Sequence, residues 1–413
     1  MLPISTQDGQ GAPFSDALFT ATSAVCVTGL VIQDTALYWS LFGQSIILLL
    51  IQIGGMGVIT FAVVIAAAAG QRISLWQRGT MQEAIAAPKI GGIVKLTGFI
   101  LAATALLELL GTVTLAFVFC PALGLGRGLW YSLFHAVSAF CNAGFDLMGV
   151  KTPFSSLTAF SAHPLVNPVI MALIVVGGLG FMTWDDLKSN RLKLRRCRMQ
   201  TKVILVTTCL LVALPALYFF CFEFSDLPLG ERFWVSLFQS VTARTAGFNT
   251  LDLNRMSEGG QGVMMLLMLT GGAPGSTAGG MKVTTLAVML STALAVFRRQ
   301  EDTHFFGRRI DEDTVRSAMA ILTLYLALFF LGGFFISRIE GLPLLTCLFE
   351  SASAVGTAGL TLGITTQVGL LSRCILVFLM YSGRVGALTL VFAALSDNRG
   401  SPARLPREKL MVG

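Results

Sequence analysis

Four short motifs along the chain have residue types and a spacing that could coordinate a cation through the backbone. Each motif is a run of small residues that ends in Gly and is followed by Leu or Phe. The motifs are Val27-Thr28-Gly29-Leu30, Asn142-Ala143-Gly144-Phe145, Thr245-Ala246-Gly247-Phe248 and Thr357-Ala358-Gly359-Leu360. A dehydrated monovalent cation needs oxygen ligands at close range, and rings of backbone carbonyls supply them without burying a full charge. We therefore predict that these four turns line one cation-binding ring.

Glycine suits such a turn because a positive φ costs it little and no Cβ atom obstructs the path. Each motif follows a short apolar segment, whose helical C-terminus would direct partial negative charge toward the centre. A tight helix-to-helix turn without a ligand is enough to explain any single motif. Four such turns, each between a half-span and a crossing helix, favour a cation pore, whereas an anion path would require rings of Arg or Lys.

A second motif interrupts the apolar stretch 261–297. Its residues are Gly271-Gly272-Ala273-Pro274-Gly275-Ser276-Thr277-Ala278-Gly279-Gly280-Met281-Lys282. Five Gly and one Pro in this run cannot maintain a regular helix, and unwound backbone at membrane depth implies a cavity. We predict an intramembrane gate here. The alternative is a kink or a short loop, but the flanking segments 261–270 and 283–297 are each too short to span alone.

Two arginines lie in apolar surroundings. Arg384 falls within the last apolar stretch, where a charge is costly and is functional by default, facing an aqueous path or binding carbonyls. Snorkelling to the cytoplasmic interface is the simpler alternative. If Arg384 is a fixed cation below the ring, its removal should speed conduction. For Arg244, which is beside the third motif, the candidate partners are Asp146, Asp252 and Glu350.

The composition identifies the class of protein. The chain has 413 residues, of which 54% are hydrophobic and only 12% are charged, and its mean hydropathy is +0.75. These values indicate a polytopic membrane protein. The net charge is +7, but a chain with so few charged residues does not supply the charge-rich soluble face that nucleic-acid binding requires. The eight Cys and three His residues form no metal-ligand motif.

Seven apolar stretches are long enough to cross about 30 Å of hydrocarbon. They are 41–69, 96–119, 166–184, 203–222, 261–297, 318–337 and 370–396. Four shorter segments have the length of re-entrant half-helices, and each ends at one of the Gly turns. They are 15–27, 129–142, 232–245 and 343–356.

The order of these segments predicts an internal repeat of two crossing helices around a half-helix. A Phe precedes the turn Gly by ten positions at Phe19, Phe134 and Phe349, and by nine at Phe238. We therefore expect an all-α membrane protein with four helix–pore-loop–helix units around a central pore. The expected units are 1–83, 84–195, 196–305 with the broken inner helix, and 306–413 with a cytoplasmic tail. The first unit lacks its outer helix, and we expect the true start to lie upstream.

Basic residues divide unequally between the two sets of loops. Twenty lie in one set and six in the other, while Arg244, Lys282 and Arg384 fall at membrane depth. The excess places the first set in the cytoplasm and the four Gly turns toward the outside.

The motifs together resemble those of the Ktr/Trk/HKT superfamily of potassium transporters, most closely the membrane subunit of bacterial Ktr systems. The resemblance covers nearly the whole chain and rests on the four turns, the 271–282 loop and two further motifs. These two are Gln52-Ile53-Gly54-Gly55-Met56-Gly57 and Gly383-Arg384-Val385-Gly386.

The resemblance implies a pseudo-fourfold pore with filter glycines at Gly29, Gly144, Gly247 and Gly359. In relatives that admit Na⁺ the first position tends to be Ser, so Gly29 supports a preference for K⁺. The resemblance further implies a gate made of the 271–282 loop and Arg384. It also implies a homodimer on a cytosolic ring of nucleotide-binding regulatory subunits. The expected location is the bacterial plasma membrane.

K⁺ uptake driven by the membrane potential, with Na⁺ or H⁺ as candidate coupling ions, is therefore the leading hypothesis. The K⁺-translocating membrane subunit of a P-type ATPase complex is the alternative, and ATP-coupled uptake would distinguish it. A third hypothesis is an inverted-repeat transporter for an organic solute, with its substrate at broken helices. An enzyme is the least favoured, since the chain has no nucleophile motif and implies no organic cofactor.

Overall fold

The computed structural model describes residues 1–57, 93–150 and 152–386. The regular secondary structure of this part is helical except for one antiparallel pair of strands, β1 (His304–Phe305) and β2 (Arg308–Arg309). The predicted all-α class is therefore confirmed.

Three helices are long, and the others are shorter. The long ones are α6 (Ile93–Leu123), α10 (Met199–Tyr218, extended by a π-helical turn over Phe219–Glu223) and α14 (Glu312–Glu340). The shorter ones are α1 (Phe14–Val25), α2 (Thr35–Tyr38), α3 (Leu41–Met56), α7 (Leu125–Phe140), α8 (Val166–Gly178), α9 (Phe181–Ser189), α11 (Leu229–Thr242), α12 (Glu258–Leu269), α13 (Val283–Phe297), α15 (Leu344–Gly356) and α16 (Leu370–Val385). Single 3₁₀ turns cover Pro3–Ser5, Met148–Val150, Thr158–Phe160, Leu194–Arg196, Leu253–Arg255 and Ile364–Thr366.

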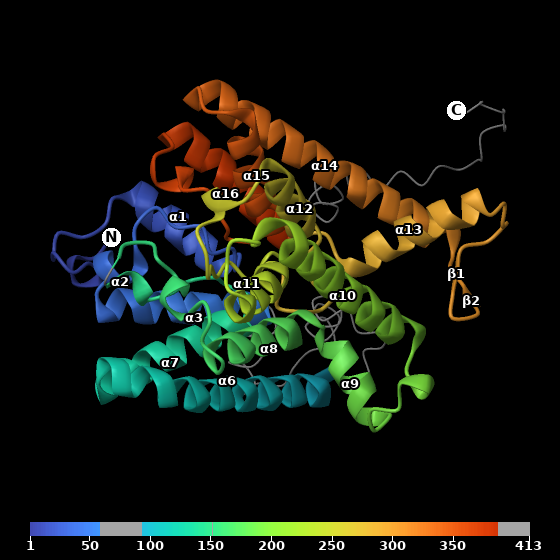
Figure 1. The fold of residues 1–413 in the computed structure, drawn as a ribbon, viewed down its shortest axis with the longest axis horizontal. Coiled ribbons are helices and arrows are strands. Elements are labelled where there is room, and N and C mark those ends of the chain that lie inside the picture. The colour runs from blue at the N-terminus through green and yellow to red at the C-terminus, as the bar shows by residue number, and fades with distance from the viewer. Residues whose placement is uncertain (58–92, 151, 387–413) are drawn as a thin grey trace.

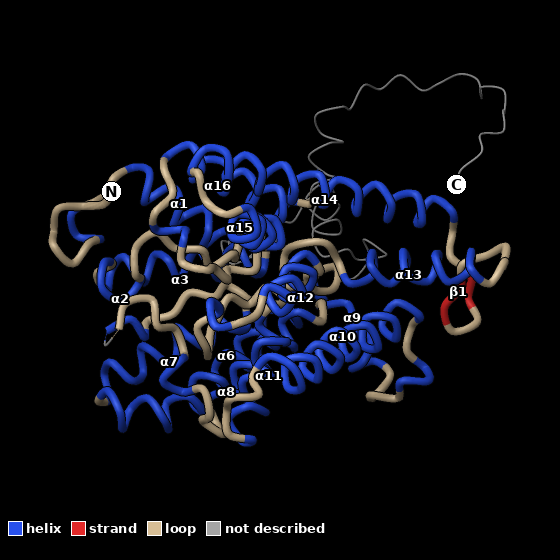
Figure 2. The backbone as a smooth tube through the Cα atoms, turned by 45° about the horizontal axis from the view of Figure 1, so that its top comes forward, coloured by secondary structure: helices blue, strands red, loops and turns tan. Residues whose placement is uncertain are grey.

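Within the described residues, three helices are long and apolar enough to cross a membrane. They cover Val94–Leu123, Met199–Glu223 and Glu312–Glu340. These match the spans predicted over 96–119, 203–222 and 318–337. In Figure 1, α14 and α6 run along opposite sides of the molecule, and Figure 2 shows loops gathered between the helices near its centre.

Two predicted spans are interrupted. The stretch 166–184 is not one helix, because α8 and α9 meet at an angle of 91°. The bend lies at Gly180, which has a φ of +86°, and the N–H of Phe181 donates to the carbonyl of Gly275 at 2.8 Å instead of continuing the helix. The stretch 261–297 is divided into α12 and α13, as the Gly-rich motif predicted. The second half of 41–69 and the end of 370–396 lie outside the described residues.

Local sequence signals explain several helix ends. The side chains of Ser40 and Ser257 cap α3 and α12 by accepting hydrogen bonds from the N–H groups of Gly43 and Gly260. Helix α14 ends at Gly341, which adopts a left-handed conformation with φ +68°. These caps fix the residues at which α3 and α12 begin and at which α14 ends.

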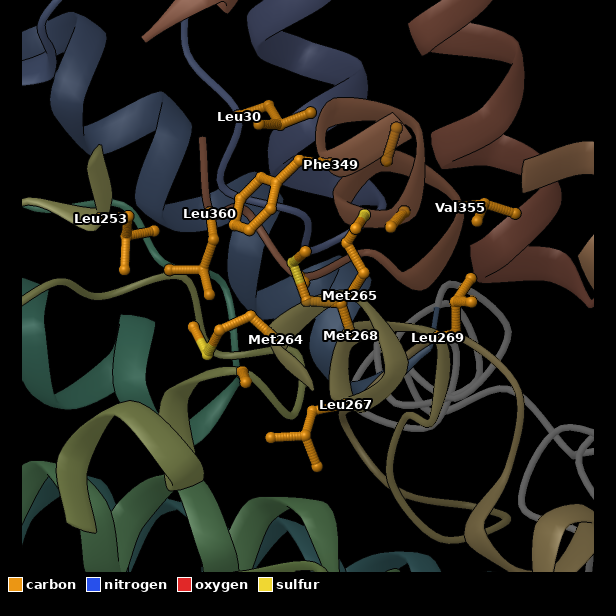
Figure 3. Packing of buried hydrophobic residues seen from close by; sticks show 14 of the residues in the cluster. Leu30, Leu253, Met264, Met265, Leu267, Met268, Leu269, Phe349, Val355 and Leu360 are labelled. Carbon is orange, nitrogen blue, oxygen red and sulfur yellow. The ribbon is translucent and has the colours of Figure 1, made fainter. Parts of the chain in front are cut away.

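Four short helices, α1, α7, α11 and α15, carry the repeated Phe residues. Phe19, Phe134, Phe238 and Phe349 are all at most 1% exposed. Phe349 belongs to the core cluster in Figure 3, where Met264, Met265 and Met268 of α12 lie near Leu360. The Phe side chains therefore anchor the short helices inside the protein and hold in place the turns that follow them.

Candidate functional site

The backbone has the same unusual conformation at the start of each of the four turns. Val27, Asn142, Thr245 and Thr357 have φ values of +56°, +58°, +66° and +51°. A positive φ is uncommon for any residue other than Gly, and for a β-branched residue it is a true outlier. Each of the four lies within three residues of the end of a short helix, so the chain leaves helical geometry in the same way at all four places.

The turn glycines also share one conformation and lie against one another in a closed ring. Gly29, Gly144, Gly247 and Gly359 have φ values between +70° and +94°. A Cβ added to Gly29 would lie 3.1 Å from Cα of Gly144, and one added to Gly144 would lie 2.7 Å from Cα of Gly247. The chain of contacts continues from Gly247 to Gly359 at 3.4 Å, and from Gly359 to Gly29 at 3.0 Å. The structure therefore brings the four turns together in chain order.

The carbonyl oxygens of these turns remain free. Within the described part of the chain, none of the carbonyl oxygens of residues 27–29, 142–144, 245–247 and 357–359 accepts a hydrogen bond. These residues are buried, and buried carbonyls are normally paired. A set of unpaired buried carbonyls at one ring is the arrangement that a dehydrated cation can complete.

The Gly-rich loop between α12 and α13 is held against other elements by its backbone. Within the loop, the N–H of Gly271 donates to the carbonyl of Met281 at 2.7 Å. Outside it, the N–H of Ala273 donates to the carbonyl of Gly178 at 2.9 Å, and the hydroxyl of Thr277 donates to the carbonyl of Phe140 at 3.0 Å. Because Phe140 is the last residue of α7, the loop lies next to the second turn.

Arg384 joins this loop to two other helices. Its guanidinium donates to the carbonyls of Thr277 and Gly54, and also to that of Gly55 at 3.3 Å. No ion pair of the described residues includes Arg384. It therefore binds backbone carbonyls, which was one of the two alternatives left open by the sequence.

Lys282 begins α13 and binds the loop that precedes it. Its ammonium group donates to the carbonyl of Ala278 at 2.8 Å and lies 3.4 Å from that of Gly279. The side chain thus pairs with carbonyls in the last turn of the loop.

Sequence reasoning missed three helix ends at glycines with positive φ. Gly57, Gly180 and Gly386 end α3, α8 and α16 with φ values of +87°, +86° and +91°. None of these three was predicted; the one interruption that the sequence predicted is the Gly-rich loop within 261–297. A signal was present, because Gly54-Gly55-Met56-Gly57 and Gly177-Gly178-Leu179-Gly180 share the pattern Gly-Gly-x-Gly.

The pairing proposed for Arg244 is not found. Among the described residues, Arg244 makes no ion pair with Asp146, Asp252 or Glu350, and its buried Nε atom has no hydrogen-bond partner. Two of these carboxylates are held elsewhere, since Asp252 accepts hydrogen bonds from Asn254 and Glu350 from threonine hydroxyls.

Asp146 lies two residues after Gly144, in the segment that leaves the second turn. Its carboxylate accepts a hydrogen bond from the N–H of Met148 at 2.9 Å. Burial raises the pKa of Asp146 to about 7, and the charge of Asp34 raises it as well, against the lowering effect of the Met148 N–H. A carboxyl that titrates near neutral pH therefore lies close to the ring.

Comparison with known families identifies the family of the chain. Residues 2–399 match the sequence model of TrkH, described as a cation transport protein. The chain belongs to the TrkH family of cation transport proteins. Members of this family are transporters rather than enzymes, and the chain is a membrane protein of the Ktr/Trk type.

Full-length relatives support this assignment. The chain is 39% identical to Ktr system potassium uptake protein B of Bacillus subtilis, and 38% identical to the potassium/sodium uptake protein NtpJ of Enterococcus hirae. Each alignment covers 100% of this chain and 92% of the relative. The fold is that of the potassium transporter TrkH from Vibrio parahaemolyticus, with a TM-score of 0.73, 18% identity and coverage of 94% of this chain and 79% of that one.

Proposed function

We propose that this TrkH-family protein is a K⁺ uptake pore whose selectivity filter consists of residues 27–29, 142–144, 245–247 and 357–359. The observation that carries the proposal is the closed ring of turn glycines, beside which buried carbonyl oxygens accept no hydrogen bond in the described part of the chain. Those oxygens replace the hydration shell of K⁺. The four short helices end at the ring, so their C-terminal partial charges also favour a cation.

Conduction needs no chemical step. With an inside-negative potential, the inward movement of one charge gains about 2.3 kcal/mol per 100 mV. The free energy of the membrane potential is therefore sufficient to drive uptake. Na⁺ and H⁺ are the candidate coupling ions, and the name of the Enterococcus relative includes sodium.

The gate in this proposal is the 271–282 loop together with Arg384. The guanidinium binds carbonyls from both the loop and α3, so it ties together elements that must separate if the path widens there. Its fixed positive charge also raises the barrier to a passing cation.

The proposed architecture has four units, 1–83, 84–195, 196–305 and 306–413, each contributing one turn to the filter. We further propose a homodimer in a bacterial plasma membrane, associated with a cytosolic ring of nucleotide-binding regulatory subunits. The naming of the Bacillus relative as part of a Ktr system is consistent with a multi-subunit assembly.

The test is ion uptake into liposomes that contain the purified chain, comparing ⁸⁶Rb⁺ and ²²Na⁺ for wild type and Gly29→Ser. A Cβ at position 29 would lie 2.6 Å from the carbonyl oxygen of Ala143, so Ser must displace a filter carbonyl. We expect wild type to prefer Rb⁺, and the variant to lose that preference by roughly tenfold or more, about 1.4 kcal/mol.

Gly124→Ser is the matched control for this substitution. Gly124 also has a positive φ, +84°, but a Cβ there meets nothing within 4 Å. It should therefore carry the same backbone strain without touching the filter, and keep the wild-type preference. Absence of Rb⁺ uptake by wild type, or equal ion preference in both variants, would contradict the filter assignment.

A further inference from the structure

The residue that follows the repeated Phe in each short helix is polar and buried. These residues are Thr20, His135, Gln239 and Glu350, at most 4% exposed. They occupy equivalent positions in α1, α7, α11 and α15, one residue after Phe19, Phe134, Phe238 and Phe349. Their chemistry differs, however, and only Glu350 carries a carboxyl group. An ionisable group buried at membrane depth points to a function.

Glu350 is bonded to the segment that leaves the fourth turn. Its Oε2 accepts a hydrogen bond from the Thr361 hydroxyl at 2.9 Å, and its Oε1 accepts one from the Thr365 hydroxyl. The two threonine oxygens lie 3.0 Å apart, and the Thr361 oxygen also accepts the N–H of Gly363 at 2.9 Å. Because Thr361 is only two residues after Gly359, this network ties the middle of α15 to the chain directly beyond the ring.

The second and third quarters of the ring are held differently. In the second, Nε2 of His135 accepts the N–H of Leu147 at 3.4 Å, which is a longer and uncharged contact. In the third, both amide atoms of Gln239 are buried and have no hydrogen-bond partner among the described residues. The second and third turns are instead tied to their short helices by the hydroxyls of Ser138 and Thr242, which donate to the carbonyls of Phe145 and Phe248 at 2.7 Å. Of these three quarters, the fourth is the one in which the residue after the repeated Phe receives two hydroxyl hydrogen bonds.

The carboxyl group of Glu350 is bound by hydroxyl groups rather than by a basic side chain of the described residues. None of the ion pairs in the described ranges includes it, and its contacts are the two hydroxyl groups. Each of its two oxygens therefore receives one threonine hydroxyl. The side chain thus fixes two residues of the segment beyond the fourth turn at the same time.

We infer that Glu350 is a positioning residue of the filter, which fixes the fourth turn through Thr361 and Thr365 and so sets how strictly the pore distinguishes K⁺ from Na⁺. The inference rests on the proposed filter. A rigid ring holds its carbonyls at the spacing that suits K⁺, whereas a loosened fourth turn lets them approach the smaller Na⁺.

The experiment measures initial rates of ⁸⁶Rb⁺ and ²²Na⁺ uptake, and the apparent KM for Rb⁺, for the full chain in liposomes. Glu350→Gln keeps the size of the side chain but cannot accept both hydroxyls. We expect the Rb⁺/Na⁺ ratio to fall roughly tenfold, as for the loss of one buried hydrogen bond, and the KM for Rb⁺ to rise.

The control for the lost carboxylate is Glu340→Gln. Glu340 lies in the same quarter and also binds two groups, the Ser372 hydroxyl at 2.5 Å and the N–H of Gly369 at 2.9 Å, but neither belongs to a turn segment. The Glu340→Gln variant should keep the wild-type Rb⁺/Na⁺ ratio even if the stability of the protein falls.

A second pair of variants tests the same network without changing a charge. Thr365→Val removes the hydroxyl and should lower the Rb⁺/Na⁺ ratio, whereas Thr365→Ser keeps the hydroxyl and should preserve it. This pair decides the question if Glu350→Gln does not fold. Wild-type ratios in Thr365→Val, or equal losses in Val and Ser, would overturn the inference. A wild-type chain without Rb⁺ flux would instead refute the proposed function.

Discussion

The residues that begin the four turns carry conformational strain. Val27, Thr245 and Thr357 are β-branched and hold positive φ values, which cost of order 1–3 kcal/mol each. Such strain persists only where the surrounding structure imposes it, and it gathers at functional sites. The sequence identified the turn glycines because Gly is typical of positive φ. It could not identify the strained positions two residues earlier, since propensity disfavours that conformation for Val and Thr.

At the same scale, Asp146 predicts a pH dependence of stability. Its folded-state pKa of about 7 lies above the ordinary aspartate pKa of 3.8, so between these pH values the folded protein binds more protons than the unfolded chain. Stability is therefore lost as the pH rises through this window. Asp146→Asn removes this loss and can still accept the N–H of Met148. We expect its Tm to exceed that of wild type at pH 8 and to approach it at pH 4.

Thermal unfolding in detergent at the two pH values measures this difference. Asp252→Asn removes an exposed carboxylate at another loop, so it controls for the change in net charge. A Tm difference between Asp146→Asn and wild type that is the same at pH 4 and pH 8 would show that Asp146 does not titrate in this window.

At the scale of elements, the apolar stretches predicted helices well and their interruptions poorly. The helices expected over 96–119, 203–222 and 318–337 are present, because length and hydropathy are properties of one segment. The 91° bend between α8 and α9 depends on a partner, the carbonyl of Gly275, which receives the N–H of Phe181. Hydropathy contains no information about such a contact between segments distant in the sequence.

The same interrupted elements predict the effect of removing Arg384. Arg384→Ala loses the hydrogen bonds to Thr277 and Gly54, so the 271–282 loop is no longer tied to α3 by this side chain, and the positive charge of the proposed gate disappears. We expect ⁸⁶Rb⁺ flux into liposomes to increase severalfold, with the Rb⁺/Na⁺ ratio unchanged because the filter is not touched.

Arg338→Ala provides the comparison for this prediction. Arg338 is an exposed basic residue in the last turn of α14, far along the chain from the loop, and its removal should leave flux at the wild-type level. Equal flux in wild type, Arg384→Ala and Arg338→Ala would mean that Arg384 does not limit conduction.

At the scale of the whole molecule, the ring must close between its first and last quarters. Helices α1 and α16 are in contact, and Asp16 of α1 forms an ion pair with Arg373 of α16 at 2.9 Å. The side chains are 9% and 22% exposed, and Asp16 also accepts the amide of Gln33 at 3.1 Å. This pair links residues 357 positions apart, and so it fastens the two ends of the described chain to each other.

Breaking this pair should therefore destabilise the protein more than breaking an exposed one. Removing one partner of a buried pair leaves an unpaired charge and costs about 3–5 kcal/mol, and partial exposure reduces this to roughly 1–3 kcal/mol. Asp226 and Arg255 form an exposed pair at 2.6 Å, for which the cost is about 0–1 kcal/mol. Asp16→Asn should lower the unfolding free energy more than Asp226→Asn does. A double-mutant cycle of Asp16→Asn with Arg373→Gln should give a coupling energy that shows a stabilising interaction between the two side chains. A coupling energy near zero would show that Asp16 and Arg373 do not stabilise the protein through their interaction with each other. Apolar packing of α1 and α16 would then be what closes the ring.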